Sequence, residues 1–417
     1  MRIININPRI IFIFLPSVLT AMIPIFLITG PFLSDLALTI VTILFIINSI
    51  KNNLVKYYQS NFFIYFILFY IYLVISSLFS DYILFSLQSS LFYLRFGIFS
   101  LSTWYLLENN KKLIKYFFVI ILFCFASLIA DGIYQYIFGE NILGFKLTNI
   151  YRISSFFNEK LVMGSYISRL TPLLIGLFLI LDFKKKGINF FFYFMLTLSG
   201  IMIYLSGERS SFFFYLITVL YLVIFLNHKN IKFFFTLSLL FIIFLGFFKP
   251  ISKTRILNET IEQLNLKNYE TERIYYYSSV HTEHYLAAIK IFLDNAIIGS
   301  GPKTFRIVCK DKKYFKNNNS CSTHPHHTYI QLLSETGVIG FLFIVFVFLY
   351  LFYFAAKAFF YKFFYKKYLL NDFQHCMFIS FFITLSPFTP SGNFFNNWLS
   401  IIYFIPIGFY LNYKKNT

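Results

Sequence analysis

The stretch GVIGFLFIVFVFLYLFYFAA at 337–356 decides the fold class, because none of its residues is charged. A helix of about 20 apolar residues crosses the hydrocarbon core of a bilayer. The rest of the chain has the same character, with 58% of its 417 residues hydrophobic and only 13% charged. Phe and Tyr are abundant while Gly and Pro are sparse, which favours lipid-facing helices over a β-barrel. We therefore expect an all-α polytopic membrane protein.

Similar apolar runs recur along the chain and predict about twelve transmembrane helices with one large loop. The first run follows Arg2 and Arg9 without a small-residue cleavage site, so it is expected to be an uncleaved first helix. The predicted spans are 10–29, 33–50, 61–80, 83–107, 113–136, 161–182, 188–205, 210–227, 231–248, 337–356, 373–391 and 397–413.

Basic residues mark every second connection between these spans and predict the topology. Positively charged connections stay in the cytoplasm, so both termini are expected there and the long loop is expected outside, in the periplasm of a bacterial inner membrane. The basic connections include Lys51 and Lys56, Lys111 and Lys112, Lys184 to Lys186, Lys229 and Lys232, Lys362 to Lys367, and Lys414 and Lys415. The chain then divides into spans one to nine at 1–249, the loop at 250–326, and an interfacial helix with the last three spans at 327–417.

The formal net charge of +19 does not predict a nucleic-acid partner. Most Lys and Arg residues lie in the short connections, where positive charge sets membrane topology. The lipid bilayer is therefore the partner that this charge pattern indicates.

Two of the four cysteines, Cys309 and Cys321, lie in the predicted outer loop with a short polar segment between them. A periplasmic location permits a disulfide, which we expect to join the two. Cys124 and Cys376 fall within apolar spans and are expected to be small core residues.

The stretch CSTHPHHTYIQLLSETGVIG at 321–340 is the strongest candidate for chemistry. Pro325 suits the first position of a helix, so we expect a helix to begin there with His326 in its first turn. The positive end of the helix would keep His326 neutral and able to accept a proton, and its free N–H groups can hold a phosphate. Gly337 and Gly340 are expected to allow close helix packing.

Two other interpretations of the histidines in this stretch stay open. They can bind a metal ion, or they can lie at the lipid headgroups on an interfacial helix. No carboxylate or cysteine pattern completes a metal site, so no metal is predicted.

Arginines near or within the predicted spans are the next candidates. Arg209, in SGERSS at 206–211, offers a bidentate fork to a phosphate, with an ion pair to Glu208 or a lipid headgroup contact as the alternatives. Arg95 and Arg169 lie inside spans, where charged groups are functional or paired. Arg169 is expected either to form an ion pair with the nearby Glu159 or to have a functional role.

The stretch HTEHYLAAIKIFLDNAIIGSGPKTFRIVC at 281–309 adds further polar candidates. It places His281 and His284 ahead of a helical apolar pattern, and Lys303 and Arg306 after a glycine-containing turn. The glycine spacing before the lysine does not match a P-loop, so the turn is expected to end the helix. Lys303 and Arg306 either supply charge for a pyrophosphate or are simply solvated.

At these residues the chain resembles the O-antigen ligase and polymerase superfamily, membrane glycosyltransferases that act on undecaprenyl-pyrophosphate-linked glycans. The family pattern is a His, then Asn, Ser or Gln, then nine residues and Gly-x-x-Gly. His326 begins this pattern and Gly337 and Gly340 end it, whereas His327 departs from the usual set. The resemblance extends to Arg209 and to the Gly-x-Gly-Pro turn at 299–302.

The resemblance implies metal-independent glycan transfer without a cofactor, because the lipid pyrophosphate already activates the sugar. His326 would take a proton from an acceptor hydroxyl while Arg209 and a loop cation stabilise the leaving pyrophosphate. The second family arginine has Arg273 or Arg306 as its counterpart, since His281 stands near its expected place. The substrate-binding candidates are Arg209, Arg273, Lys303, Arg306, His281, His284 and His324.

Several activities fit this resemblance. An O-antigen ligase would use lipid A-core as the acceptor, a polymerase would use a growing glycan, and a third group glycosylates proteins. A polysaccharide transporter or flippase is the alternative from a different class. The polar cluster lies in an outer loop and Gly/Pro-broken helix pairs are not evident, which disfavours transport.

Overall fold

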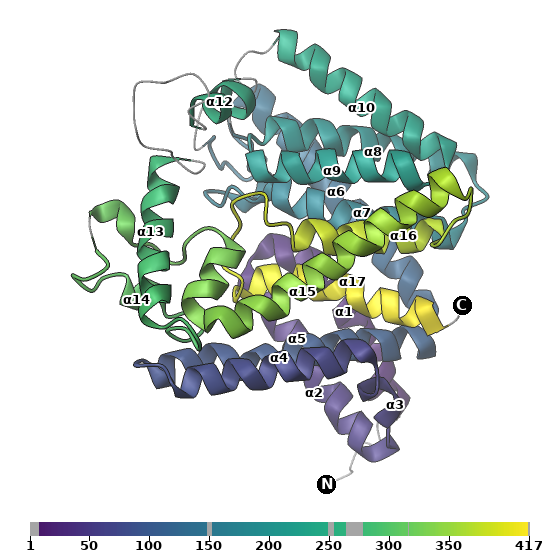
Figure 1. Ribbon diagram of the computed structural model, residues 1–417. Helices are drawn as coiled ribbons and strands as arrows, with labels where there is room; N and C mark the ends of the chain where they lie inside the picture. Colours follow the sequence, from purple (N-terminus) through teal and green to yellow (C-terminus); the bar gives the residue numbers. More distant parts are fainter. Residues whose placement is uncertain (1–7, 148–151, 249–253, 264–277, 316, 416–417) are drawn as a thin grey trace.

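The computed structural model describes residues 8–147, 152–248, 254–263, 278–315 and 317–415 (Figure 1). Each predicted span falls on a helix, and the described residues form no β-strand, which confirms the all-α fold. The span helices are α1 (Leu15–Thr29, preceded by the π-helical turn η1, Ile10–Phe14), α2 (Pro31–Asn52), α4 (Asn61–Leu78), α5 (Ile83–Asn109), α6 (Lys112–Phe138), α7 (Met163–Leu181), α8 (Lys186–Leu205), α9 (Arg209–Phe225), α10 (Lys229–Phe248), α15 (Thr328–Phe364), α16 (Asp372–Thr384) and α17 (Asn397–Lys415).

Nine helices in the described part of the chain are long and apolar enough to cross a membrane. The protein is therefore a multi-pass membrane protein. The other three predicted spans fall on α9, α16 and α17, of which α9 and α16 have only 17 and 13 residues. The number of about twelve spans thus stays a prediction.

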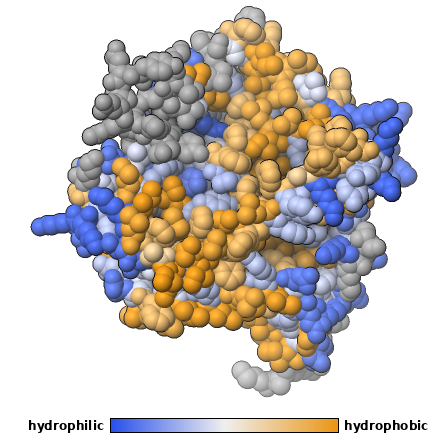
Figure 2. All heavy atoms as spheres, viewed as in Figure 1, coloured by the Kyte–Doolittle hydropathy of each residue, from blue (hydrophilic) through white to orange (hydrophobic). Residues whose placement is uncertain are grey.

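The long helices lie side by side in one bundle, with α17 packed against α5 and α16 packed against α7 (Figure 1). The segments α13 (Ser279–Asp294) and α14 (Phe305–Val308) lie at one end of this bundle, and the C-terminus and α3 (Val55–Tyr58) lie toward the other. Figure 2 shows hydrophilic residues gathered at these two ends and a broad hydrophobic zone between them. A bundle that crosses a bilayer needs this distribution of polar groups.

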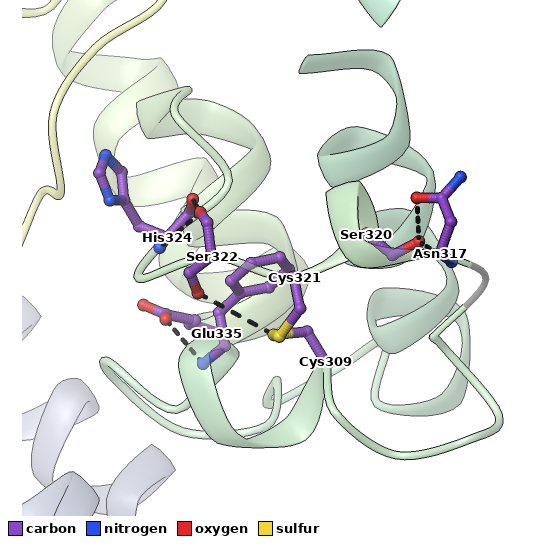
Figure 3. The surroundings of a disulfide bond; sticks show 8 residues. Cys309, Asn317, Ser320, Cys321, Ser322, His324 and Glu335 are labelled. Atoms are coloured by element: carbon purple, nitrogen blue, oxygen red, sulfur yellow. Dashed lines mark hydrogen bonds between the residues drawn. A yellow bond between two sulfur atoms is a disulfide. The ribbon is translucent and has the colours of Figure 1, made fainter. Parts of the chain in front are cut away.

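The described part of the predicted outer loop contains a small hydrophobic core. Ala287, Ala288 and Ile291 of α13 pack with Phe305, Cys309 and Tyr314 in a core separate from that of the bundle. A disulfide joins Cys309 to Cys321, with the two Cα atoms 5.2 Å apart (Figure 3). The other short elements are η2 (Ser155–Phe157), η3 (Thr254–Asn258), α12 (Glu259–Gln263) and η4 (Asn318–Ser320).

Helix α15 differs from its prediction at Gly337. This glycine has φ +62° and ψ −171°, so the helix is broken there rather than continuous. The break lets Val338 N–H donate to the Ala296 carbonyl at 2.8 Å, and a Cβ at Gly337 would collide with the Ile297 backbone. The expected role in helix packing was therefore wrong for Gly337, which instead lets the loop backbone approach α15. Gly340, which faces Tyr72 of α4, is in close helix contact as expected.

Candidate active site

A cavity of about 1300 Å³ opens where the outer loop meets the helix bundle. Its walls come from segments far apart in the sequence, including α7, α9, α13, the turn before α14 and the segment between α16 and α17. The cationic and imidazole side chains in its wall are Arg152, Lys160, Arg169, Arg209, Lys303, Arg306, His281 and His324. Such a wall favours an anionic ligand, since opposite charges attract strongly where water is scarce.

Four histidines meet at one side of this cavity. The His326 ring lies 4.1 Å from the His324 ring, 5.4 Å from His284 and 5.7 Å from His281, measured between ring centroids. His281 and His324 line the cavity itself, and the His326 ring contacts both of them. The structure thus brings together histidines that lie more than forty positions apart.

The imidazoles of this cluster are held in the neutral form. Burial, and then the neighbouring His284, lowers the pKa of His326 to about 4. Burial also lowers the pKa of His324 to about 3 and that of His281 to about 4, with His326 as the next cause in both cases. Arg306 and Arg209 add to the lowering at His324 and His281, respectively. Burial and neighbouring positive charge therefore keep these rings neutral and able to accept a proton. The expected effect of the helix dipole is not the main cause.

Helix α15 begins at Thr328 rather than at Pro325, and His327 caps it. The His327 Nδ1 atom accepts from Ile330 N–H at 3.4 Å, and its Nε2 atom lies 3.0 Å from the Pro387 carbonyl. These two bonds assign the proton to Nε2, because a carbonyl accepts and a backbone N–H donates. His327 therefore serves as the N-cap of α15, a position at which Asn and Ser are commonly found in proteins.

Several amides at this helix end are bound within the protein, which leaves fewer of them for a phosphate than expected. Thr328 N–H donates to Ser391 Oγ at 2.7 Å, Ile330 N–H to His327, and Gln331 N–H to the His327 carbonyl. Ser391 N–H in turn donates to the His326 carbonyl at 2.9 Å. This bond holds His326 in a left-handed conformation with φ +60°, which is uncommon for a residue with a side chain.

The turn that carries Lys303 is docked on α15 through its backbone. Ser300 and Gly301 N–H donate to the carbonyls of Ser334 and Glu335 at 3.0 and 2.8 Å. The Glu335 carboxylate, fully buried, accepts from Lys303 N–H at 2.9 Å and Phe305 N–H at 3.0 Å. These bonds place the Lys303 side chain at the cavity, where burial, followed by Arg306, lowers its pKa. The sequence reasoning missed Glu335, although a carboxylate next to an apolar span was the available signal.

Arg209 lines the cavity at the start of α9, and the preceding residue fixes that helix to its neighbour. The Glu208 carboxylate accepts from Gly164 N–H at 2.6 Å, Ser165 N–H at 2.9 Å and the Ser211 hydroxyl at 2.9 Å. Burial raises the pKa of Glu208 to about 7, against the lowering effect of these donors. Glu208 thus ties the start of α9 to the start of α7.

The two intramembrane arginines have different surroundings. Arg95 forms an ion pair with Asp35 at 2.6 Å. Arg169 forms no ion pair with Glu159 in the part of the chain that the structure describes, so the expected pairing was wrong. Its guanidinium lies instead over the rings of Phe214 and Tyr403, 4.6 and 5.3 Å from their centroids.

Arg273 lies outside the described residues, so Arg306 is the loop arginine that the structure places at the cavity. Among the described ranges, no group of three or more His, Cys, Asp or Glu side chains is arranged to hold a metal ion. The Cys309–Cys321 bridge lies beside the segment that leads into the histidine cluster, and Figure 3 shows the His324 ring turned away from it.

The fold and the site define a polytopic membrane protein in which loop segments help to line a cationic cavity beside a histidine cluster. Residues 193–345 match the family model described as O-antigen ligase, a range that includes Arg209, the turn at 299–302 and the whole His326 to Gly340 pattern. This match, over about a third of the chain, confirms that the region resembles O-antigen ligases. No curated protein matches the chain.

Proposed function

We propose that this protein transfers a glycan from an undecaprenyl-pyrophosphate donor to an acceptor hydroxyl on the periplasmic face of the inner membrane. The acceptor oxygen forms a bond to the anomeric carbon of the sugar, and the bond from that carbon to the pyrophosphate oxygen breaks. The hydroxyl proton moves to an imidazole, and undecaprenyl pyrophosphate leaves as the anion. The observation that carries the proposal is a neutral histidine cluster against a cation-lined cavity within the matched region.

The charges of the cavity suit both stages of this reaction. Arg209, Lys303 and Arg306 supply fixed positive charge to the pyrophosphate, whose negative charge grows as the sugar leaves. A bound pyrophosphate also offsets the positive charge that lowers the histidine pKa values, and so strengthens the base when the donor is present. Binding of the donor and activation of the acceptor are thereby coupled.

We assign the base role to His326, at the start of the family pattern and the centre of the ring cluster. His324 is its competitor, because it lines the cavity and its ring lies against that of His326. His327 is a poor candidate for the base, since both of its ring nitrogens are engaged in capping and in the bond to Pro387.

Within the superfamily we favour an O-antigen ligase, with lipid A-core as the acceptor. Polymerisation onto a growing glycan is the second candidate, because the same base and the same cations would serve a sugar hydroxyl. Neither reaction requires a metal or a nucleotide in this scheme. The ligase and the polymerase therefore differ in their acceptor and share the same donor chemistry, so the acceptor must be identified to tell them apart.

The test uses the full chain in nanodiscs with an undecaprenyl-pyrophosphate glycan donor. The acceptors are lipid A-core, a second lipid-linked glycan and a protein, and the donor affinity and initial transfer rate are measured. We expect His326→Ala to lose roughly two to four orders of magnitude in rate with the donor affinity retained. Arg209→Lys keeps the charge but loses the planar fork, so it should weaken donor binding as well as transfer.

Lys184→Gln is the matched control, because Lys184 is highly exposed in the connection between α7 and α8. Its transfer rate should equal that of the wild type. Near-normal turnover of His326→Ala, with loss in His324→Ala, would move the base to His324. Normal turnover in both variants would exclude His326 and His324 as the base, and absence of transfer by the wild type to every acceptor would contradict the proposed function.

A further inference from the structure

Arg169 is the intramembrane cation whose charge the proposed mechanism leaves unused. It is only 4% exposed, lines the cavity, and its Nη1 atom has no hydrogen-bond partner within the described ranges. A buried charge without a counterion is strongly disfavoured unless a ligand supplies the opposite charge. These properties suit a side chain that binds an anionic ligand.

Neighbouring side chains fix the orientation of the Arg169 guanidinium. Its Nε atom donates to Ser165 Oγ at 3.2 Å, and its guanidinium lies over Phe214 and Tyr403. Aromatic faces attract a guanidinium but do not neutralise it. One edge of the planar fork is thus held by the protein, and the Nη1 group has no partner among the described residues.

A second unpartnered donor lines the same cavity. Asn393 is 6% exposed, and its Oδ1 atom accepts from Gln331 and from Phe395 N–H. Its Nδ2 group has no partner among the residues that the structure describes. Two buried donors without a partner among the described residues thus belong to residues that line one cavity, although buried polar groups are normally bonded.

The site adjoins the proposed pyrophosphate clamp. Ser165, which holds Arg169, is itself held by the Glu208 carboxylate next to Arg209. Arg169 follows Ser165 by one helical turn, or about 6 Å along the axis of α7. An anion bound to Arg169 can therefore belong to the same donor molecule whose leaving group Arg209 contacts.

Resting on the proposed function, we propose that Arg169, with Asn393, forms a second oxyanion subsite for the lipid-linked donor. Two parts of the donor have the required chemistry, a phosphate of the pyrophosphate and the carboxylate of an acidic sugar. Both present oxygen pairs that match the guanidinium fork. In either case Arg169 is a substrate-binding residue that decides which donors are held.

The test measures binding without transfer, using the full chain in nanodiscs. The probes are undecaprenyl pyrophosphate alone, the same lipid with a neutral glycan, and the same lipid with a uronic-acid-containing glycan. Arg169→Met keeps the length of the side chain over the two rings and removes the charge. We expect it to weaken binding of at least one probe about 10- to 100-fold, with part of this loss restored in Arg169→Lys.

Thermal stability without ligand separates binding from structure. Replacing an unpaired buried charge with an apolar group should leave the unfolding temperature unchanged or raise it. Lys184→Gln, which removes one charge beyond the opposite end of α7, should bind all probes like the wild type. A loss for every probe would identify the pyrophosphate as the ligand, and a loss for the acidic glycan alone would identify the carboxylate.

Three outcomes would overturn the inference or its basis, and they can be told apart. Equal binding by Arg169→Met and the wild type would show that Arg169 contacts no ligand. Failure of Arg169→Met to fold, or a clearly lowered unfolding temperature, would show that the charge supports the protein itself. A wild type that binds none of the three probes would instead contradict the proposed function.

Discussion

The low pKa of His326 gives the proposed base a specific pH dependence. Since that pKa is about 4 in the ligand-free site, kcat/KM should stay level as the pH falls through 6.5 and decline only near 4. Bound pyrophosphate adds negative charge and raises the pKa, so the acid limb of kcat should lie at higher pH than that of kcat/KM.

Initial rates of transfer measured over a range of pH and donor concentrations give both limbs. The protein should be checked for folding at each pH, and His327→Asn serves as a variant that retains the base. A kcat/KM limb near 6.5, the ordinary histidine value, would show that the titrating base is not a buried ring of this cluster.

The cap formed by His327 predicts which substitutions the family position accepts. Asn can accept the Ile330 N–H in place of the imidazole, so His327→Asn should keep most of the stability and the transfer rate. His327→Leu removes the cap and should cost about 1 kcal/mol of stability. Thermal unfolding and transfer assays of both variants check this prediction. A rate loss in His327→Asn as large as that in His326→Ala would show that the His327 imidazole takes part in the reaction.

At the scale of elements, the outer loop depends on its disulfide to hold the segment next to the histidine cluster. Cys309 and Cys321 are separated by 12 positions, and closing such a loop contributes about 3 kcal/mol in the chain-entropy treatment. Thiol labelling of the unreduced protein should therefore miss both residues, and labelling after reduction should find them. Cys124 and Cys376 are buried in the bundle, so a Cys124→Ala/Cys376→Ala background removes their signal. Ready labelling of both loop cysteines without reductant would contradict the bridge.

The helices were predictable from hydropathy, but the contacts that build the site were not. Apolar runs placed every span on a helix, because burial of backbone groups in lipid leaves few alternatives. The break at Gly337 depends on a backbone contact with Ala296, which no local pattern encodes. The predicted ion pair between Arg169 and Glu159 was wrong. The neighbours of the Arg169 guanidinium, Phe214 and Tyr403, come from α9 and α17, which are distant in the sequence.

At the scale of the whole molecule, the alternation of basic connections predicts that the site faces the periplasm. The loop segments α13 and α14 lie at one end of the bundle, away from α3 and the C-terminus (Figure 1). Reporters fused after Lys112, Lys186 and Lys367 should report cytoplasm, and one near Lys313 should report periplasm. A matched pair of phosphatase and fluorescent-protein fusions at each site gives opposite signals on the two sides. A cytoplasmic signal at Lys313 would contradict the orientation, and with it both the oxidising surroundings of Cys309 and the access of a periplasmic donor to Arg209.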